Sequence, residues 1–260
     1  HFAMKKEIVI NAGLGETRAA LLEDRRLVEF YVERQEDQRV VGNIYKGRVE
    51  NVLPGMQAAF VNIGLERNAF LYVDDALAYR VDGEGGNGHH NGKNGDGAKV
   101  HSIKDILREG QHIVVQVTKE PIGTKGARVV THVTLPGRYL VLMPTVEYVG
   151  VSRRIQSERE RQRLKGIARK IKPKGMVLIV RAVADGKTEE ELSQDCRFLL
   201  GIWERIQRRA KRMSPPALLY KDYDLVYRIV RDSFTADVDK FVVDSPTEYE
   251  KTLELLDTLS

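Results

Sequence analysis

Two phenylalanines in the segment GMQAAFVNIGLERNAFL, residues 55–71, have the type and spacing needed to stack unpaired nucleobases. The segment reads as two strands joined by a short turn, and the small and branched apolar side chains of both strands fall on one face. Phe60 and Phe70 fall on the other face between small or polar neighbours, so we expect two large rings exposed to solvent. A base that stacks on such a ring gains roughly 1–3 kcal/mol.

Basic residues accompany the two rings on neighbouring predicted strands and loops: Lys46, Arg48, Arg67, Lys119 and Lys125. Cations that follow the phosphates, beside rings that accept bases, are typical of surfaces that bind single-stranded nucleic acid. The alternative is that one or both rings pack beneath a neighbouring domain, because an exposed aromatic patch marks a contact site of any kind. The basic residues favour nucleic acid, and we expect Lys46, Arg67 and Lys125 to contact it.

Positive charge is concentrated in one region of the chain. The net charge is +5, but residues 151–214 contain 18 Lys and Arg against 8 Asp and Glu, which leaves the remainder mildly acidic. Such a basic module indicates a polyanionic ligand, although a basic helix is also often a solvated face. The macrodipole favours cations at a helix end in any case, and the predicted second helix of this region ends in a basic cluster: Arg205, Arg208, Arg209, Lys211 and Arg212.

The strands that would position the two rings form a small barrel. Five candidate strands lie at residues 42–53, 57–63, 67–73, 111–118 and 126–134, and five short strands fit an oligonucleotide-binding (OB) fold whose ligand crosses strands two and three. Those two strands carry the two rings. Residues 82–99 contain seven glycines and read as a flexible loop between the third and fourth strands.

The two ends of the chain are expected to meet around this middle. An N-terminal strand and hairpin, residues 6–32, need a layer to cover them, and a helix, strand and helix after residue 216 can supply it. Between the barrel and this tail, capping residues Ser157 and Thr188 start two amphipathic helices. We therefore predict an α+β chain of several domains, with the middle inserted into a discontinuous outer domain.

Metal chemistry has few candidates in this sequence. Asp222 with Asp224, and Asp237 with Asp239, are the carboxylate pairs that could hold Mg²⁺, yet both pairs lie near predicted helix ends where capping and solvated roles are commoner. The single cysteine, Cys196, excludes an internal disulfide and a multi-cysteine zinc site. We predict no metal ligand and no catalytic residue here. No apolar stretch approaches a membrane span and no signal peptide is evident, so a cytoplasmic protein is expected.

A series of motifs, in order, closely resembles the N-terminal half of the bacterial ribonuclease E/ribonuclease G family: VGNIYKGRV, AAFVNIGLERNAFL, IKDILREGQ, GTKGA, GRYLVLMP, SRRI and GMVLIVR. The resemblance implies an OB-type RNA-binding domain and an α/β region that senses the 5′ monophosphate of RNA, both inserted into a ribonuclease-H-like domain. On this basis we divide the chain into residues 4–38 with 217–260 (ribonuclease-H-like), 39–131 (OB) and 132–216 (sensor).

The resemblance also implies roles for single residues. Phe60, Phe70 and Lys125 match RNA-contacting positions of the barrel, in agreement with the strand alternation. The phosphate sensor is implied at Gly137, Val141, Arg153 and Arg181, with Arg181 as the main phosphate ligand and Ala182 after it. The family usually has threonine where this chain has Ala182, so a hydroxyl contact is missing. From the residues alone, Arg181 reads as a strand-end arginine paired with a carboxylate such as Asp185.

The activity implied by the resemblance is that of an endoribonuclease specific for single strands, acting in RNA processing and decay. In the family the catalytic aspartates, which use Mg²⁺, and the cysteines of a zinc link between subunits lie further downstream, and this sequence stops before both. We therefore expect a fragment that binds RNA, preferably 5′-monophosphorylated, without cutting it, from a protein that is a homo-oligomer at full length. The alternative is a stand-alone, non-catalytic RNA-binding or translation-associated protein.

Overall fold

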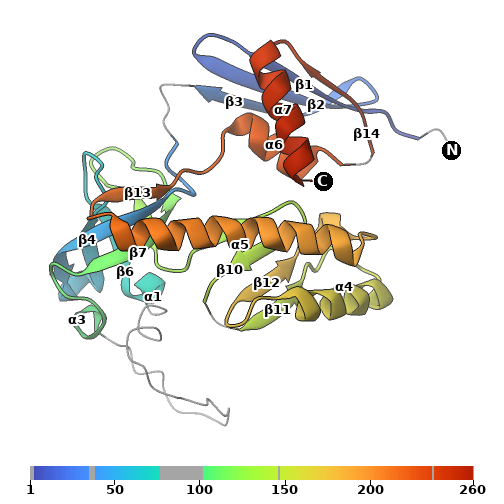
Figure 1. Ribbon diagram of the computed structural model, residues 1–260. Coiled ribbons are helices and arrows are strands. Elements are labelled where there is room, and N and C mark those ends of the chain that lie inside the picture. Colours follow the sequence, from blue (N-terminus) through green and yellow to red (C-terminus); the bar gives the residue numbers. More distant parts are fainter. Residues whose placement is uncertain (1–2, 35–38, 77–101, 146, 236, 260) are drawn as a thin grey trace.

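The computed structural model describes residues 3–34, 39–76, 102–145, 147–235 and 237–259. The glycine-rich loop predicted at residues 82–99 lies outside these ranges. The described chain is an α+β structure with three hydrophobic cores, one in the barrel, one between a small sheet and two helices, and one where the two chain ends meet (Figure 1).

The barrel confirms the predicted five-stranded architecture. Its strands, in chain order, are β4 (Ile44–Leu53), β5 (Ala58–Asn62), β6 (Ala69–Tyr72), β7 (His112–Lys119) and β8 (Arg128–Val130). Hydrogen bonding runs β4-β5-β6-β8-β7, and pairing of β7 with β4 closes the ring. The inward faces of the strands form the barrel core, which includes Val61 and Leu71 as the alternation predicts. Two short helices lie in the chain between β6 and β7: α1 (Val73–Ala76) and α3 (Ile103–Ile106).

A second sheet and two helices form the middle of the chain. The sheet has the order β11 (Tyr148–Val151), β12 (Val177–Val180), β10 (Leu140–Met143), β9 (Leu135–Pro136). Its apolar face packs against α4 (Glu158–Ile171) and α5 (Glu189–Arg212). Thr188 and Glu191 form the predicted capping box of α5, whereas Ser157 caps α4 without the reciprocal bond from Glu160.

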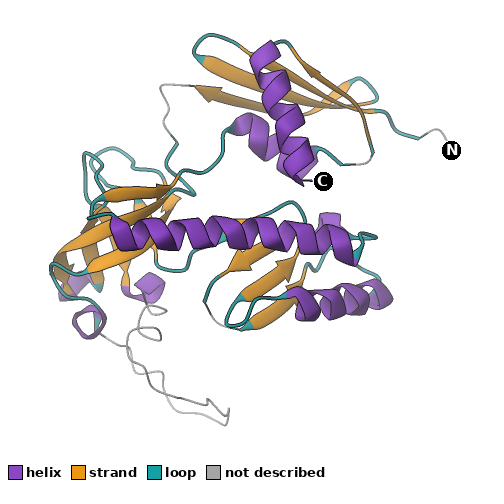
Figure 2. Ribbon diagram, viewed as in Figure 1, coloured by secondary structure: helices purple, strands orange, loops and turns teal. Residues whose placement is uncertain are grey.

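Helix α5 connects this sheet to the barrel. At 24 residues it is about 36 Å long, and it runs from the strands β10 and β12 to the side of the barrel (Figure 2). The chain then forms β13 (Ala217–Tyr220), which pairs with the first residues of β4.

The outer unit joins the two chain ends. Its sheet has the order β14 (Val238–Val243), β1 (Lys6–Ala12), β2 (Glu16–Glu23), β3 (Arg26–Arg34), with β14 parallel to β1. Helices α6 (Leu225–Ser233) and α7 (Pro246–Leu259) supply the expected covering layer on one face (Figure 1). Segments from both ends of the chain thus form one sheet, and the barrel and the second sheet lie between them in sequence. No helix within the described ranges is long and apolar enough to span a membrane.

Candidate nucleic-acid interface

The outer face of β5 and β6 carries a cluster of three aromatic rings. Phe60 lies directly opposite Phe70 in the antiparallel pairing, and their ring centroids are 5.1 Å apart in an edge-to-face arrangement. Tyr72 is two residues further along β6 and therefore on the same face, and its ring centroid lies 4.8 Å from that of Phe70. None of these rings belongs to the barrel core, so the alternation that placed Phe60 and Phe70 outside it is correct.

The exposure expected for Phe70 is wrong. Its side chain is only 5% exposed, whereas Phe60 is half-buried. Phe70 is covered from outside the barrel by the rings of Phe60 and Tyr72, and the ammonium of Lys125 lies 5.5 Å from its centroid. Phe70 therefore supports the other two rings, and Phe60 offers the accessible aromatic surface.

A cavity of about 670 Å³ opens over this cluster. It is lined by two basic side chains, polar groups and the rings: Asn51, Met56, Phe60, Arg67, Asn68, Phe70, Tyr72, Thr124, Lys125 and Gly126. We call this set the barrel surface site. Arg67 and Lys125 are both exposed, and the Lys125 amine is 3.5 Å from the Tyr72 hydroxyl. The site thus combines aromatic faces with exposed cations, which is the combination that accepts a base and the phosphates beside it.

Two contributors to this region were missed from the sequence. Tyr72 shares the face of Phe70, and the two-residue alternation was sufficient to find it. The Arg128 guanidinium lies 4.9 Å from the Tyr72 ring centroid and forms a salt bridge of 2.9 Å with Asp75. This contact joins β8 to β6, strands far apart in sequence, so no local pattern indicates it.

Lys46 lies away from the barrel surface site. Its amine donates a hydrogen bond of 2.6 Å to the carbonyl of Ala210, and Arg48 on the same strand donates one of 3.4 Å to Pro215. Both cations therefore hold the C-terminal end of α5 and the residues after it against β4, where helix carbonyls lack partners within the helix. The structure does not bring Lys46 to the rings.

Arg181, the predicted phosphate ligand, is paired with a carboxylate. One guanidinium nitrogen donates to the Gly137 carbonyl at 2.6 Å and to Asp232 of α6 at 2.9 Å. Burial acts against the ionised form of Asp232, but hydrogen bonds from Arg231 and Arg181 outweigh it and lower the pKa of Asp232. The partner is thus Asp232 rather than Asp185, and a phosphate at Arg181 has to compete with an ionised carboxylate.

Gly137 is required by a buried carboxylate. Asp195 of α5 is 5% exposed and accepts backbone N–H bonds from the three residues after Gly137, at 2.9–3.0 Å. A Cβ at position 137 would lie 2.5 Å from an Asp195 oxygen, so only glycine leaves room for this arrangement. Burial raises the pKa of Asp195 although the backbone donors act to lower it.

The remaining predicted sensor residues lie in or just after the neighbouring strands β10, β11 and β12. Arg153 is exposed and lines a cavity of about 500 Å³ with Arg161 and Lys165. Ala182 lines a different cavity of about 360 Å³, and Val141 is paired with Ile179 within the sheet. Ile179 also lines the cavity beside Arg153, so Val141 and Arg153 are connected through this strand pair.

The four aspartates considered for a metal each have another partner. Asp224 caps α6, and Asp222 accepts the backbone N–H of Tyr223. Asp237 and Asp239 both bind Lys6, through its amine and its backbone N–H respectively. In the described part of the chain, no three His, Cys, Asp or Glu side chains gather at a spacing that could hold a metal ion.

Comparison with known proteins places these features in one family. A model described as the Ribonuclease E/G family matches residues 134–260. Ribonuclease G of Salmonella typhimurium (strain SL1344) is 42% identical over 254 residues, and ribonuclease G of Haemophilus influenzae is 44% identical over 253 residues; each alignment covers 96% of this chain and 50% of the relative. Ribonuclease E of Nostoc sp. is 43% identical over 243 residues, which are 93% of this chain and 33% of that protein. The chain spans half or less of the length of these relatives, and it belongs to the ribonuclease E/G family.

Proposed function

We propose that this chain binds single-stranded RNA through the barrel surface site. The observation that carries the proposal is the half-buried Phe60, supported edge-on by Phe70 and facing a cavity lined by Arg67 and Lys125. An unpaired base stacks on Phe60 while the two cations neutralise the phosphates on either side. The relatives are named ribonucleases, which supports RNA as the nucleic acid.

Replacing the accessible ring tests this assignment. We expect Phe60→Ala to weaken binding of a short single-stranded RNA by about tenfold or more, because one stacked base is worth roughly 1–3 kcal/mol. Phe30→Ala is the matched control, since Phe30 is an exposed ring on β3 in the outer unit. Fluorescence anisotropy at fixed salt measures both. Equal affinities for the two variants would show that the RNA site, if any, lies elsewhere.

In the whole protein we propose that this chain serves a single-strand-specific endoribonuclease of RNA processing and decay. Hydrolysis would depend on Mg²⁺ held by residues outside this chain, and a zinc link would join the subunits of a cytoplasmic homo-oligomer. The engagement of Asp222, Asp224, Asp237 and Asp239 with backbone groups and Lys6 supports the proposal that this chain does not cut RNA by itself. A stand-alone RNA-binding protein is the less favoured function, because the matched relatives are named ribonucleases.

We further propose that the region around Arg181 senses the 5′ monophosphate. A guanidinium offers paired donors to phosphate oxygens. The Arg181 side chain is one-quarter exposed, and one of its guanidinium nitrogens already donates a hydrogen bond to the Gly137 carbonyl. Phosphate binding requires Arg181 to release Asp232. Asp232 therefore competes with the phosphate for Arg181, and the affinity for the phosphate is lower than it would be if Arg181 had no carboxylate partner.

Removing the Asp232 carboxylate should strengthen phosphate binding at Arg181. Asp232→Asn should increase affinity for a 5′-monophosphorylated RNA by about tenfold relative to its 5′-hydroxyl form, because a like charge beside the phosphate is removed. Asp239→Asn is the control, since Asp239 accepts the backbone N–H of Lys6 and does not line the cavity beside Ala182. Anisotropy titrations with the two RNA ends, repeated in Arg181→Ala, measure the preference. A preference that is unchanged in Asp232→Asn and survives in Arg181→Ala would remove Arg181 from the sensor.

A further inference from the structure

The second half of α5 borders a basic cavity that the proposed function does not use. The cavity has a volume of about 510 Å³ and lies between α5 and the segment formed by β13 and the residues after it. Five cations, two tyrosines and three aliphatic side chains line it: Ile202, Arg205, Ile206, Arg208, Arg209, Arg212, Leu219, Tyr220, Lys221 and Tyr223. We call it the arginine pocket.

The charge of the arginine pocket is unbalanced. The four arginines are spaced three and four residues apart, so they share one face of α5, where like charges destabilise a helix. No carboxylate lines the cavity, and no described carboxylate forms a salt bridge with Arg205, Arg208 or Arg212. The macrodipole favours cations only in the last turn, and Arg205 and Arg208 precede it. A mobile or bound anion is needed to offset this charge.

The walls of the pocket are held in place. Arg209 donates a hydrogen bond of 3.0 Å to the Leu219 carbonyl, which joins α5 to β13. The rings of Tyr220 and Tyr223 meet edge to face with centroids 6.0 Å apart, and Tyr223 stacks on Tyr227 at 3.5 Å. Guanidinium groups beside fixed aromatic rings are the surface that tracks single-stranded nucleic acid, since phosphates meet the cations and bases meet the rings.

We propose that the arginine pocket is a second contact site for the backbone of the single-stranded RNA that occupies the barrel surface site, an inference that rests on the proposed function. Strand β4 links the two sites. Its first residues pair with β13 at Tyr45 and Lys46, and Asn51 lines the barrel surface site. The seven residues from Tyr45 to Asn51 span about 20 Å of strand. An RNA longer than one OB site therefore reaches from the rings to the arginines.

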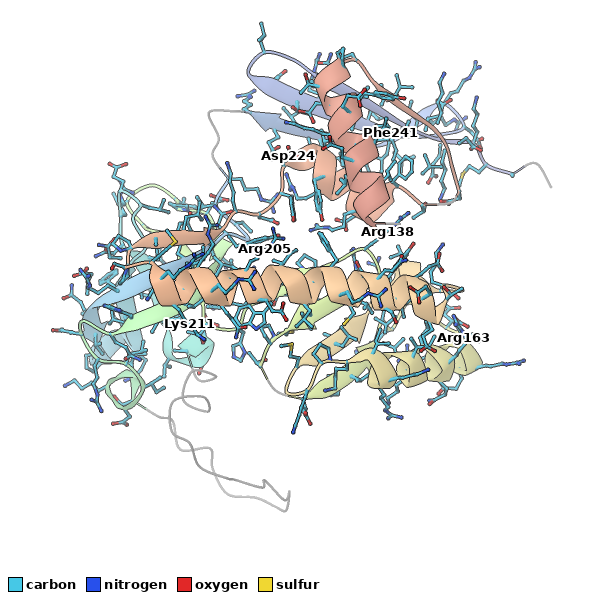
Figure 3. All side chains as sticks on the ribbon, in the orientation of Figure 1. Arg138, Arg163, Arg205, Lys211, Asp224 and Phe241 are labelled. Carbon is cyan, nitrogen blue, oxygen red and sulfur yellow. The ribbon has the colours of Figure 1, made fainter. Side chains whose placement is uncertain are left out.

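A pair of variants isolates the pocket. The test variant carries Arg205→Gln and Arg208→Gln, which remove two cations that line the cavity. The control carries Arg197→Gln and Lys211→Gln, which remove the same charge from exposed positions of α5 outside the pocket. Lys211 lies about 240° around the helix from Arg205, and Figure 3 shows the two residues at different edges of α5. Arg209 is kept because it holds β13.

Two lengths of RNA separate the two sites. For an RNA of about 20 nucleotides, longer than the 4–16 that one OB fold covers, we expect the test variant to bind roughly tenfold more weakly than the control. The slope of log affinity against log salt should fall by about 1.4, as two phosphate contacts of a single strand are lost. An RNA of about 5 nucleotides should bind both variants equally, because it fills the barrel surface site alone.

The outcomes distinguish this inference from the function on which it rests. Equal affinity and equal salt slope of the test and control variants with the long RNA would overturn the arginine pocket as an RNA contact, even where Phe60→Ala weakens the short RNA. Failure of the wild-type chain to bind either RNA would overturn the proposed function first. Loss of binding to phosphatidylglycerol vesicles in the test variant, with long-RNA affinity unchanged, would identify a lipid surface and reject the RNA assignment.

Discussion

Asp195→Ala should lower the free energy of unfolding by about 3–5 kcal/mol, the largest stability effect that we expect from a single carboxylate in this chain. The Asp195 oxygens accept the backbone N–H groups of Arg138, Tyr139 and Leu140, and the site is almost closed to water. Alanine leaves three buried donors without an acceptor, and each such donor costs roughly 1–3 kcal/mol. Part of the loss is offset, because removing Asp195 also removes a charge whose burial is unfavourable.

The expected loss can be checked by urea unfolding followed by circular dichroism. Asp185→Ala is the control, since Asp185 is an exposed carboxylate that follows the same sheet. It should change the unfolding free energy by no more than about 0.5 kcal/mol. The turn that Asp195 holds also contains the Gly137 carbonyl bonded to Arg181, so the 5′-phosphate preference should fall together with stability. If Asp195→Ala had the same urea unfolding midpoint as the wild-type chain, Asp195 would not be holding this turn in place.

Gly126→Ala is expected to disrupt the barrel surface site directly. A Cβ at position 126 would lie 2.0 Å from the carbonyl oxygen of Asn68, a backbone atom that cannot rotate away as the end of a flexible side chain could. The neighbouring Phe70 N–H donates to Ala127 at 2.7 Å, so neither segment can move without breaking this bond. We expect a stability loss of about 3 kcal/mol, at the upper end of ordinary overpacking, and RNA affinity lowered by about tenfold.

Gly55→Ala provides the comparison for this prediction. Gly55 lies in the turn between β4 and β5, beside the same site, and a Cβ there would meet no atom within 4 Å. Its unfolding midpoint and RNA affinity should match those of the wild-type chain. If Gly126→Ala behaved in the same way, the close approach of residue 126 to β6 would be disproved.

Strand alternation was enough to predict the barrel and the outward direction of its rings. Val61 and Leu71 lie in the core and Phe60 does not, because side-chain direction in a strand depends only on position. The burial of Phe70 was not predictable in this way. It results from three side chains that close over the ring, and one of them, Lys125, comes from a loop about 55 residues further along the chain.

The partners of the basic residues were the least predictable part of the site. Arg181 bonds to Asp232, 51 positions away, and Lys46 bonds to the Ala210 carbonyl, 164 positions away. The sequence shows where a basic residue is and on which face of its helix or strand it lies. Which distant acceptor its side chain bonds to is decided only when the helices and strands pack together. The family resemblance pointed to Arg181 and Gly137. It could not reveal that Asp232 bonds to Arg181, or that Asp195 accepts the N–H groups of the residues after Gly137.

The parallel pairing of β1 with β14 has a consequence for biosynthesis. Ile8 lies beside Phe241, so β1 acquires this neighbour only after more than 230 further residues have been translated. At about 5–20 residues per second, the early hairpin waits roughly 10–50 s with its apolar face uncovered. The barrel, whose strands all lie between Ile44 and Val130, can complete itself well before then. Nascent chains should therefore gain a folded barrel while the hairpin of β2 and β3 still lacks the helices that cover its sheet.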